Sequence, residues 1–273
     1  MSNSKFAEFN LDPALAEAVA AASEQEVIEG IIRLEDPKEI PPQFRLVTQF
    51  IRICTGRFRA ADTWRIRRHP NVVSLKAARP LSIAQQSDSL FPVDKFGRPG
   101  AASLPYTGRG SIVAMLDFGL DFGHPNFLNP DGTTRVMSLW HQGAPYQSGS
   151  PNRYGYGRVF SQQEINLALL ESDPYRALGY HPAISDNGHG SHGTHTTDIA
   201  AGNGQALNSL RGVAPEADLL FVHLSTPRSA PGANLGDSVR MLEALDFTFQ
   251  HNSRPERTGQ RKPLPLDREQ ALQ

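Results

Sequence analysis

The sequence is poor in three features: cysteine, long apolar runs and an excess of charge of either sign. Cys54 is the single cysteine among 273 residues, which excludes an intrachain disulfide and fits a reducing compartment. No apolar run approaches the roughly 20 residues that a transmembrane helix needs. The 27 basic and 28 acidic side chains nearly cancel, so neither a nucleic-acid nor a membrane partner is expected.

The first residues also lack the pattern of a secretion signal. Residues 1–20, MSNSKFAEFNLDPALAEAVA, contain neither a basic segment nor an uninterrupted apolar core. We therefore expect a cytoplasmic protein. The composition, 39% hydrophobic and 20% charged, is typical of a globular chain with room for one large domain or two smaller ones.

A stretch rich in histidine and small residues covers residues 186–204, DNGHGSHGTHTTDIAAGNG. Its small side chains predict a tightly packed helix that begins at His192 and stops at Gly202. The dipole at a helix N-terminus disfavours an extra proton on an imidazole, which suits a general base near pH 7. His192 is therefore the candidate base.

A strand that ends on an aspartate supplies a partner for this base. Residues 110–119, GSIVAMLDFG, begin with an apolar run that predicts a buried parallel strand, and the run stops at Asp117. In open α/β sheets the functional side chains follow the carboxyl ends of strands. Asp117 and His192 together suggest a Ser-His-Asp hydrolase.

Three segments resemble the subtilisin-like serine proteases, in the order of that family. Residues 108–127, GRGSIVAMLDFGLDFGHPNF, resemble the aspartate block, and residues 192–202, HGTHTTDIAAG, resemble the histidine block. Residues 212–224, GVAPEADLLFVHL, are similar to the strand that follows. The resemblance implies an α/β fold with a parallel-sheet subtilisin-like catalytic domain.

The same resemblance implies roles for single residues. Asp117 would orient the histidine, and His192 would act as general base and acid. His195 would be the structural second histidine of the block, and His189 a loop residue. The family needs no cofactor. Asn126 stands where its H-P-D motif can contribute to a calcium site, so calcium is not supported by this sequence.

The histidines and Asp117 also allow roles without acid-base chemistry. The histidines can be satisfied helix and loop side chains, or Asp186, His189, His192 and His195 can form a zinc site. A zinc site takes three or four converging ligands, and the chain has one cysteine and no H-E-x-x-H motif. Asp117 can instead be a cap at the end of its strand.

Two departures from the family pattern lie close to the predicted site. Phe118 replaces the usual serine or threonine after the aspartate and so removes a hydroxyl from its neighbourhood. Asp198 stands where the helix often has glycine, which places a carboxylate on a crowded surface.

An N-terminal α+β domain, residues 1–78, precedes this block and looks like the propeptide domain of many subtilases. An unrelated α+β extension is the alternative. Residues 79–109 read as a linker. The expected elements are a helix capped by Asp12 and running to about residue 23, strands at 26–34, 44–53 and 72–76, and a short helix at 60–68.

The catalytic domain, residues 110–252, is expected to be incomplete and to carry an insertion at 128–185. Residues 133–142 and 154–170 resemble the bacterial branch that includes the spore-germination proteases. Ser161 and Glu164 form a capping-box pattern at a helix start. The aromatic residues of the insertion either pack it onto the core or line the rim of a substrate cleft; they are Trp140, Tyr154 and Tyr156.

The last predicted element is a helix at 238–251. Its apolar face is expected to consist of Val239, Leu242, Leu245 and Phe249. Residues 253–273 are charged, interrupted by prolines and without periodicity, which predicts a disordered tail.

The serine block of the family, G-T-S-x-A-x-P, does not occur in the 273 residues. Ser225 and Ser229 lie in a loop rich in proline and alanine. The resemblance therefore implies a serine-type endopeptidase present as a truncated chain, and we expect this chain alone to be inactive. The alternative is a non-catalytic inhibitor or protein-binding module. Expected partners are a peptide or protein substrate and a missing C-terminal half or another protease.

Overall fold

A computed structural model describes residues 11–81, 106–146, 153–183, 191–206, 211–225 and 236–251. Its contacts divide the chain into two compact units. Unit 1 joins the segment up to Pro80 to Asp237–Phe247, and unit 2 contains Leu81–Gly236. None of the helices in the described ranges is long and apolar enough to cross a membrane.

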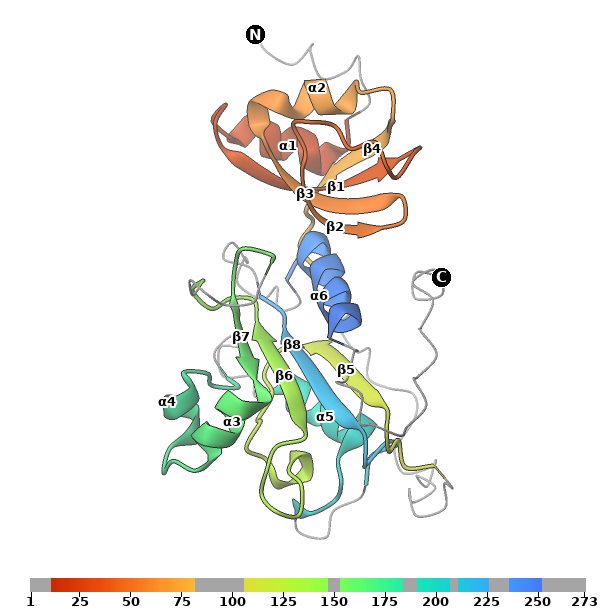
Figure 1. Cartoon of the computed structure of the whole chain (residues 1–273). Helices are drawn as coiled ribbons and strands as arrows, with labels where there is room; N and C mark the ends of the chain where they lie inside the picture. The colour runs from red at the N-terminus through yellow and green to blue at the C-terminus, as the bar shows by residue number, and fades with distance from the viewer. Residues whose placement is uncertain are drawn as a thin grey trace, which may run out of the picture. The chain divides into compact units, whose positions relative to one another are not determined.

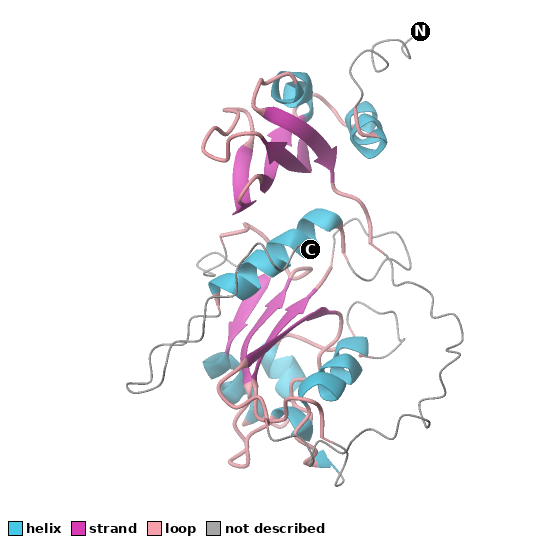
Figure 2. Cartoon of the chain, turned by 90° about the vertical axis from the view of Figure 1, so that its right-hand side faces the viewer, coloured by secondary structure: helices cyan, strands magenta, loops and turns pink. Residues whose placement is uncertain are grey.

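Unit 1 is built on a four-stranded antiparallel sheet with the strand order β2-β3-β1-β4. Helices α1 and α2 lie on one face of this sheet (Figures 1 and 2). Asp12 caps α1, because its carboxylate accepts from the Leu15 backbone N–H at 3.3 Å. The elements are α1 (Pro13–Ala21), β1 (Val27–Leu34), β2 (Arg45–Phe50), β3 (Ile53–Arg59), a 3-10 turn (Ala60–Asp62), α2 (Thr63–Arg67) and β4 (Val72–Ala77).

The predicted strand at 44–53 is confirmed over Arg45–Phe50, but its end is wrong, because the chain reverses after Phe50. Strands β2 and β3 form a hairpin in which Phe50 pairs with Ile53. Ile51, between them, adopts a left-handed conformation with φ of 50°. A β-branched residue is disfavoured in this conformation. The sequence does not indicate the turn, because this position has neither glycine nor asparagine. The pairing of the two strands holds this conformation in place.

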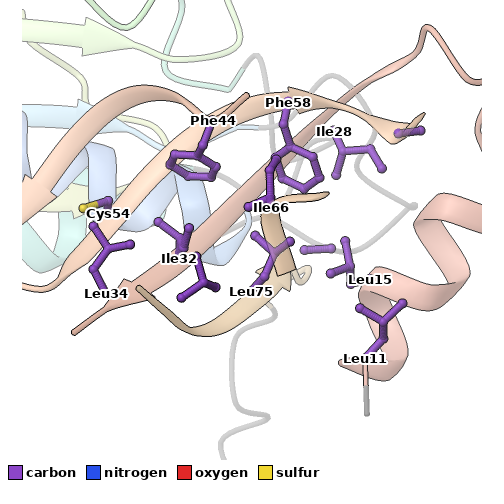
Figure 3. Close-up of a cluster of buried hydrophobic side chains, with 13 residues drawn as sticks. Leu11, Leu15, Ile28, Ile32, Leu34, Phe44, Cys54, Phe58, Ile66 and Leu75 are labelled. Atoms are coloured by element: carbon purple, nitrogen blue, oxygen red, sulfur yellow. The ribbon is translucent and has the colours of Figure 1, made fainter. Parts of the chain in front are cut away.

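The core of unit 1 joins side chains of the sheet to side chains of both helices, and Figure 3 shows these buried residues. Leu15, Ile32 and Ile66 are each completely buried, and burial of such a side chain contributes about 1.5–3 kcal/mol. Cys54 belongs to the same cluster, and burial raises the pKa of its thiol to about 11. This cysteine is therefore a core residue that stays protonated at neutral pH.

Helix α6 (Ser238–Gln250) contacts the sheet of unit 1 through charged side chains. The carboxylate of Glu243, which is completely buried, accepts from the Arg57 guanidinium at 2.8 and 3.2 Å and from the Thr55 hydroxyl at 3.0 Å. Glu29 pairs with Arg57 at 3.1 Å and with Arg240 at 3.0 Å. We call Glu29, Arg57, Arg240 and Glu243 the charge cluster of unit 1.

This cluster corrects the predicted face of α6. Val239 is buried as expected, but Leu242, Leu245 and Phe249 are only half-buried, while Arg240, Glu243 and Asp246 are buried. Helical periodicity of apolar residues could not reveal this, because ion pairing allows a charged face to be buried. The sequence assigned this helix to residues 110–252, whereas its first ten residues pack with the N-terminal segment. The boundaries at 78 and 110 stay predictions.

Unit 2 contains a four-stranded sheet with the order β5-β8-β6-β7 (Figure 1). Strands β5, β8 and β6 are parallel, and β7 runs antiparallel to β6, so the α/β class is confirmed with a mixed sheet. The elements are β5 (Ile112–Asp117), a 3-10 turn (Pro125–Phe127), β6 (Val136–His141), β7 (Arg158–Ser161), α3 (Gln162–Leu169), α4 (Pro174–Leu178), α5 (His192–Ala201) and β8 (Asp218–His223).

One expectation about this sheet is wrong. Strand β5 is parallel as predicted, but it is an edge strand within the described residues, and only Asp117 of its six residues is buried. The segment 128–185, predicted as an insertion, supplies β6 and β7 of the sheet. The burial expected of β5 is found in β8, which lies between two parallel neighbours.

The predictions of a helix cap and of aromatic packing in unit 2 are confirmed. Ser161 and Glu164 form a complete capping box at the start of α3. Trp140 is completely buried, and its ring stacks on Tyr154 with 4.6 Å between centroids and lies 5.3 Å from Tyr156. These aromatic residues pack the segment onto the sheet, as in the first of the two alternatives. Residues 253–273 and most of 79–109 lie outside the described residues.

Candidate active site

The carboxyl ends of three parallel strands bring polar side chains together. The register pairs Asp117 of β5 with His223 of β8, and His223 with His141 of β6. All three residues are the last of their strands. They lie at the edge of the sheet where open α/β sheets place their functional groups.

His192 reaches this edge from the first residue of α5, as the sequence predicted. Its Nδ1 lies 2.8 Å from Oδ1 and 2.9 Å from Oδ2 of Asp117. The Asp117 side chain is 7% exposed and the His192 side chain 42% exposed. A carboxylate can only accept, so Nδ1 carries the proton of the neutral ring, and Nε2 keeps its lone pair.

Two further donors complete the coordination of the Asp117 carboxylate. The Phe118 backbone N–H donates to Oδ1 at 2.7 Å, and the Thr196 hydroxyl donates to Oδ2 at 2.8 Å. Each oxygen therefore accepts from His192 and from one other group. The sequence interpretation missed Thr196, whose signal is its position one helical turn after His192.

The loop after Asp117 is held against the start of α5. Gly193 donates its backbone N–H to the Phe118 carbonyl at 2.7 Å, and Thr194 donates to the Gly119 carbonyl at 2.9 Å. Gly119 has φ of 70°, and a Cβ there would lie 2.5 Å from the Pro182 carbonyl oxygen. Only glycine fits this loop, which fixes the approach of helix and strand.

Phe118, the first departure from the family pattern, lies against the imidazole. Its ring stacks on that of His192 with 5.0 Å between centroids and 18° between planes. Phe118 itself is 3% exposed. The aromatic side chain thus covers one face of His192 and limits the orientations of the ring.

The second departure, Asp198, forms a hydrogen bond with Asn126. Asn126 donates from Nδ2 to the Asp198 carboxylate at 2.7 Å, and its Oδ1 accepts from the Ala206 backbone N–H at 2.8 Å. The carboxylate of Asp198 on α5 therefore has a hydrogen-bond donor in the described structure.

Behind Asp117 lies a buried group of two histidines and a tyrosine. The Leu120 backbone N–H donates to the Tyr180 hydroxyl at 3.0 Å, and this hydroxyl lies 2.8 Å from Nδ1 of His223. Burial lowers the pKa of His223 to about 3 and that of His141 to about 4. Both rings are neutral at pH 7, and Nδ1 of His223 can accept the tyrosine proton.

His195 is exposed on α5, and none of these contacts involves it. Asp186 and His189, which the alternative zinc site would need, lie outside the described residues, as does Ser229. Ser225 follows β8 and lies beside Gly143. Within the described ranges, no group of three or more His, Cys, Asp or Glu side chains is placed to hold a metal ion.

Comparisons with known proteins point to one family. Residues 108–255, more than half of the 273, match the Subtilase family (peptidase S8). The chain is 31% identical over 159 residues to subtilisin-like protease SBT2.2 of Arabidopsis thaliana, covering 52% of this chain and 17% of the relative. It is 25% identical over 205 residues to subtilisin-like protease SBT1.2 of the same plant, covering 70% of this chain and 26% of the relative.

A solved structure, the CspB protease of Clostridium perfringens, aligns with 53% of this chain and 26% of its own chain, with 25% identity and a TM-score of 0.43. The bacterial branch named from the sequence stays a prediction. Asp117 and His192 both lie inside the matched residues 108–255. Because that match covers more than half of the sequence, the chain belongs to the subtilase family of serine-type peptidases.

Proposed function

We propose that Asp117 and His192 form the acid-base half of a proteolytic site. The observation that carries this proposal is the contact of His192 Nδ1 with both oxygens of a buried carboxylate, while the ring itself is 42% exposed. The carboxylate holds the Nδ1–H tautomer, so Nε2 is left to take a proton from a nucleophile and return it to the leaving amine. Peptides or proteins are the substrates that the family implies.

The nucleophile in this proposal is a serine that the 273 residues do not contain. In this proposal the serine block lies in a separate segment; the matches cover 17% and 26% of the two plant proteases. This chain alone would then show no peptidase activity, and a segment with the serine block would restore it.

The N-terminal segment has a proposed role as well. Its α+β architecture, four antiparallel strands with two helices on one face, supports the propeptide-like interpretation of residues 1–78. In this proposal the charge cluster of unit 1 is the means by which the segment engages α6. No cofactor enters the proposal, and the expected compartment is the cytoplasm.

A fluorophosphonate probe, which labels activated serines, tests the acid-base role. The purified chain is incubated with the probe alone and together with a separately expressed C-terminal segment of a related subtilase that carries the serine block. Labelling of that segment only in the mixture is the expected result. Asp117→Asn and His192→Gln should each reduce the labelling rate by about 10³-fold or more, because they remove one member of a cooperating triad.

The control is His195→Gln, which changes an exposed histidine three residues along the same helix. It should label at the wild-type rate. Labelling of the isolated chain, or equal labelling with Asp117→Asn, would contradict the proposal. Absence of labelling in every mixture, with all proteins folded, would favour the alternative of a non-catalytic binding module.

A further inference from the structure

Thr196 lies one helical turn after His192 on α5, with its side chain at the same carboxylate. Its hydroxyl donates to Oδ2 of Asp117 at 2.8 Å. The backbone carbonyls of His192 and Gly193 are also within reach of this hydroxyl, at 3.2 and 3.3 Å. A threonine hydroxyl has one proton, so these three acceptors compete for it.

The carboxylate is the strongest of the three acceptors. A hydrogen bond to an ionised oxygen is shorter and about twice as strong as one to a neutral carbonyl. The distances agree with this order, because the carboxylate is 0.4 Å nearer than the His192 carbonyl, 2.8 against 3.2 Å. Asp117 is 5% exposed, so water has little access to replace the hydroxyl at Oδ2.

Thr196 donates a hydrogen bond to the carboxylate from its side chain. Phe118 cannot do so, because its side chain has no donor group. Phe118 gives the carboxylate only its backbone N–H, at Oδ1, and its ring faces His192 instead. Among the described residues, Oδ2 accepts from Thr196 and from Nδ1 of His192. Without the hydroxyl, only the Phe118 backbone N–H and His192 itself would fix the rotation of the carboxylate about its Cβ–Cγ bond.

We propose that Thr196 is a positioning residue of the acid-base pair. Its hydroxyl holds the Asp117 carboxylate in the orientation that accepts from His192 Nδ1, and thereby keeps the neutral imidazole in the Nδ1–H tautomer. The donor comes from the same helix as the base, so carboxylate and imidazole are aligned by one rigid element. This inference rests on the proposed roles of Asp117 and His192.

The test reads the tautomer of His192 directly in the full chain. Nitrogen-15 spectra of the histidine rings are recorded at alkaline pH, and His192→Gln identifies the His192 signals. Wild type should show a protonated Nδ1 and an unprotonated Nε2. Thr196→Val keeps the shape of the side chain and removes the donor. In this variant the Nδ1 and Nε2 shifts of His192 should move toward the average of both tautomers.

Two further variants separate positioning from packing. Thr196→Ser keeps the hydroxyl and should restore the wild-type pattern. Thr197→Val is the matched control, because Thr197 is buried on the same helix and its hydroxyl has no partner among the described residues. It should leave the His192 shifts unchanged.

The outcomes distinguish this inference from the proposed function. A wild-type His192 that is not in the Nδ1–H tautomer would overturn the acid-base role of the pair and this inference with it. A wild-type pattern retained in Thr196→Val would overturn the inference alone. An averaged pattern in Thr196→Ser as well would assign the effect to the methyl group and its packing, which also overturns it. Should Thr196→Val not fold, the Thr196→Ser spectrum still decides between hydroxyl and methyl.

Discussion

Two sets of buried charges in this chain differ in their access to solvent. In unit 1, Glu243 is completely buried and Arg57, which it contacts through both oxygens, is 6% exposed. In unit 2, Asp117 is 5% exposed, but its partner His192 keeps 42% of its side chain in contact with solvent. A closed ion pair stabilises one packing arrangement, whereas a half-open imidazole can also exchange a proton with a bound molecule.

The second difference between the two sets concerns the partners. Arg57 is charged at every pH at which the protein is folded, so its pair with Glu243 is permanent. His192 is instead held through Nδ1 by a carboxylate that also accepts from the Phe118 backbone N–H and the Thr196 hydroxyl, and its Nε2 keeps a lone pair. Depth of burial alone therefore does not distinguish a charge that stabilises the fold from one that can take part in catalysis. The solvent exposure and the chemical type of the less buried partner distinguish them.

The largest effect is expected from breaking the closed pair of unit 1. Arg57→Met leaves the carboxylate of Glu243 buried without its bidentate partner, and removal of one member of such a pair lowers the free energy of unfolding by about 3–5 kcal/mol. Urea unfolding followed by circular dichroism measures this loss. Combining Arg57→Met with Glu243→Leu should recover much of it, because no unpaired charge remains.

A smaller loss is expected in unit 2 when the pH falls. In the folded protein, burial lowers the pKa of His223 to about 3 and of His141 to about 4, from an ordinary value of 6.5. Below about pH 6.5 these two histidines bind protons in the unfolded chain but remain neutral in the folded chain. The free energy of unfolding should therefore be unaffected by these residues well above that pH, be lower by roughly 1–2 kcal/mol at pH 6, and continue to fall toward pH 4.

The variant that sharpens this prediction is His141→Leu. Nδ1 of His141 is buried and has no hydrogen-bond partner among the described residues, so leucine removes a titrating group without breaking a hydrogen bond at that atom. Urea unfolding between about pH 7 and pH 5 should show a shallower decline for the variant than for wild type. An unchanged slope would show that His141 is accessible to protons in the folded state.

The smallest effect is expected from an open ion pair. Arg52 and Glu35 lie 3.6 Å apart with side chains 55% and 71% exposed. Arg52→Met should lower the free energy of unfolding by no more than about 1 kcal/mol, because solvent screens an exposed pair. Measured beside Arg57→Met, it compares the same substitution at an open and a closed site. Equal losses would contradict the distinction between the two kinds of pair.

Much of the site could be predicted from the sequence because its residues lie in local patterns. His192 heads a helix of small residues and Asp117 ends an apolar run, and each pattern extends over a few consecutive residues. Thr196 could not be assigned in this way. Its role depends on a carboxylate 79 positions away in the chain, and no local pattern reports which way its hydroxyl points.

The fold shows the same division. Helix α1 was placed by Asp12 and Pro13, and the capping box placed the start of α3. The turn at Ile51 and the buried charges of α6 were missed, because both contradict the preferences of the residues involved. Partners elsewhere in the chain override those preferences when they supply paired strands or opposite charges.

The sequence by itself determined the family, the order of the blocks, the α/β class and the two residues proposed for acid-base chemistry, because these depend on consecutive side chains. Tertiary structure decided that segment 128–185 supplies two strands of the sheet, that Thr196 completes the coordination of Asp117, and that α6 buries its charges against the N-terminal sheet. The physical reason is that hydrogen bonds and ion pairs between distant segments depend on distance and orientation, which the linear pattern of polarity does not contain.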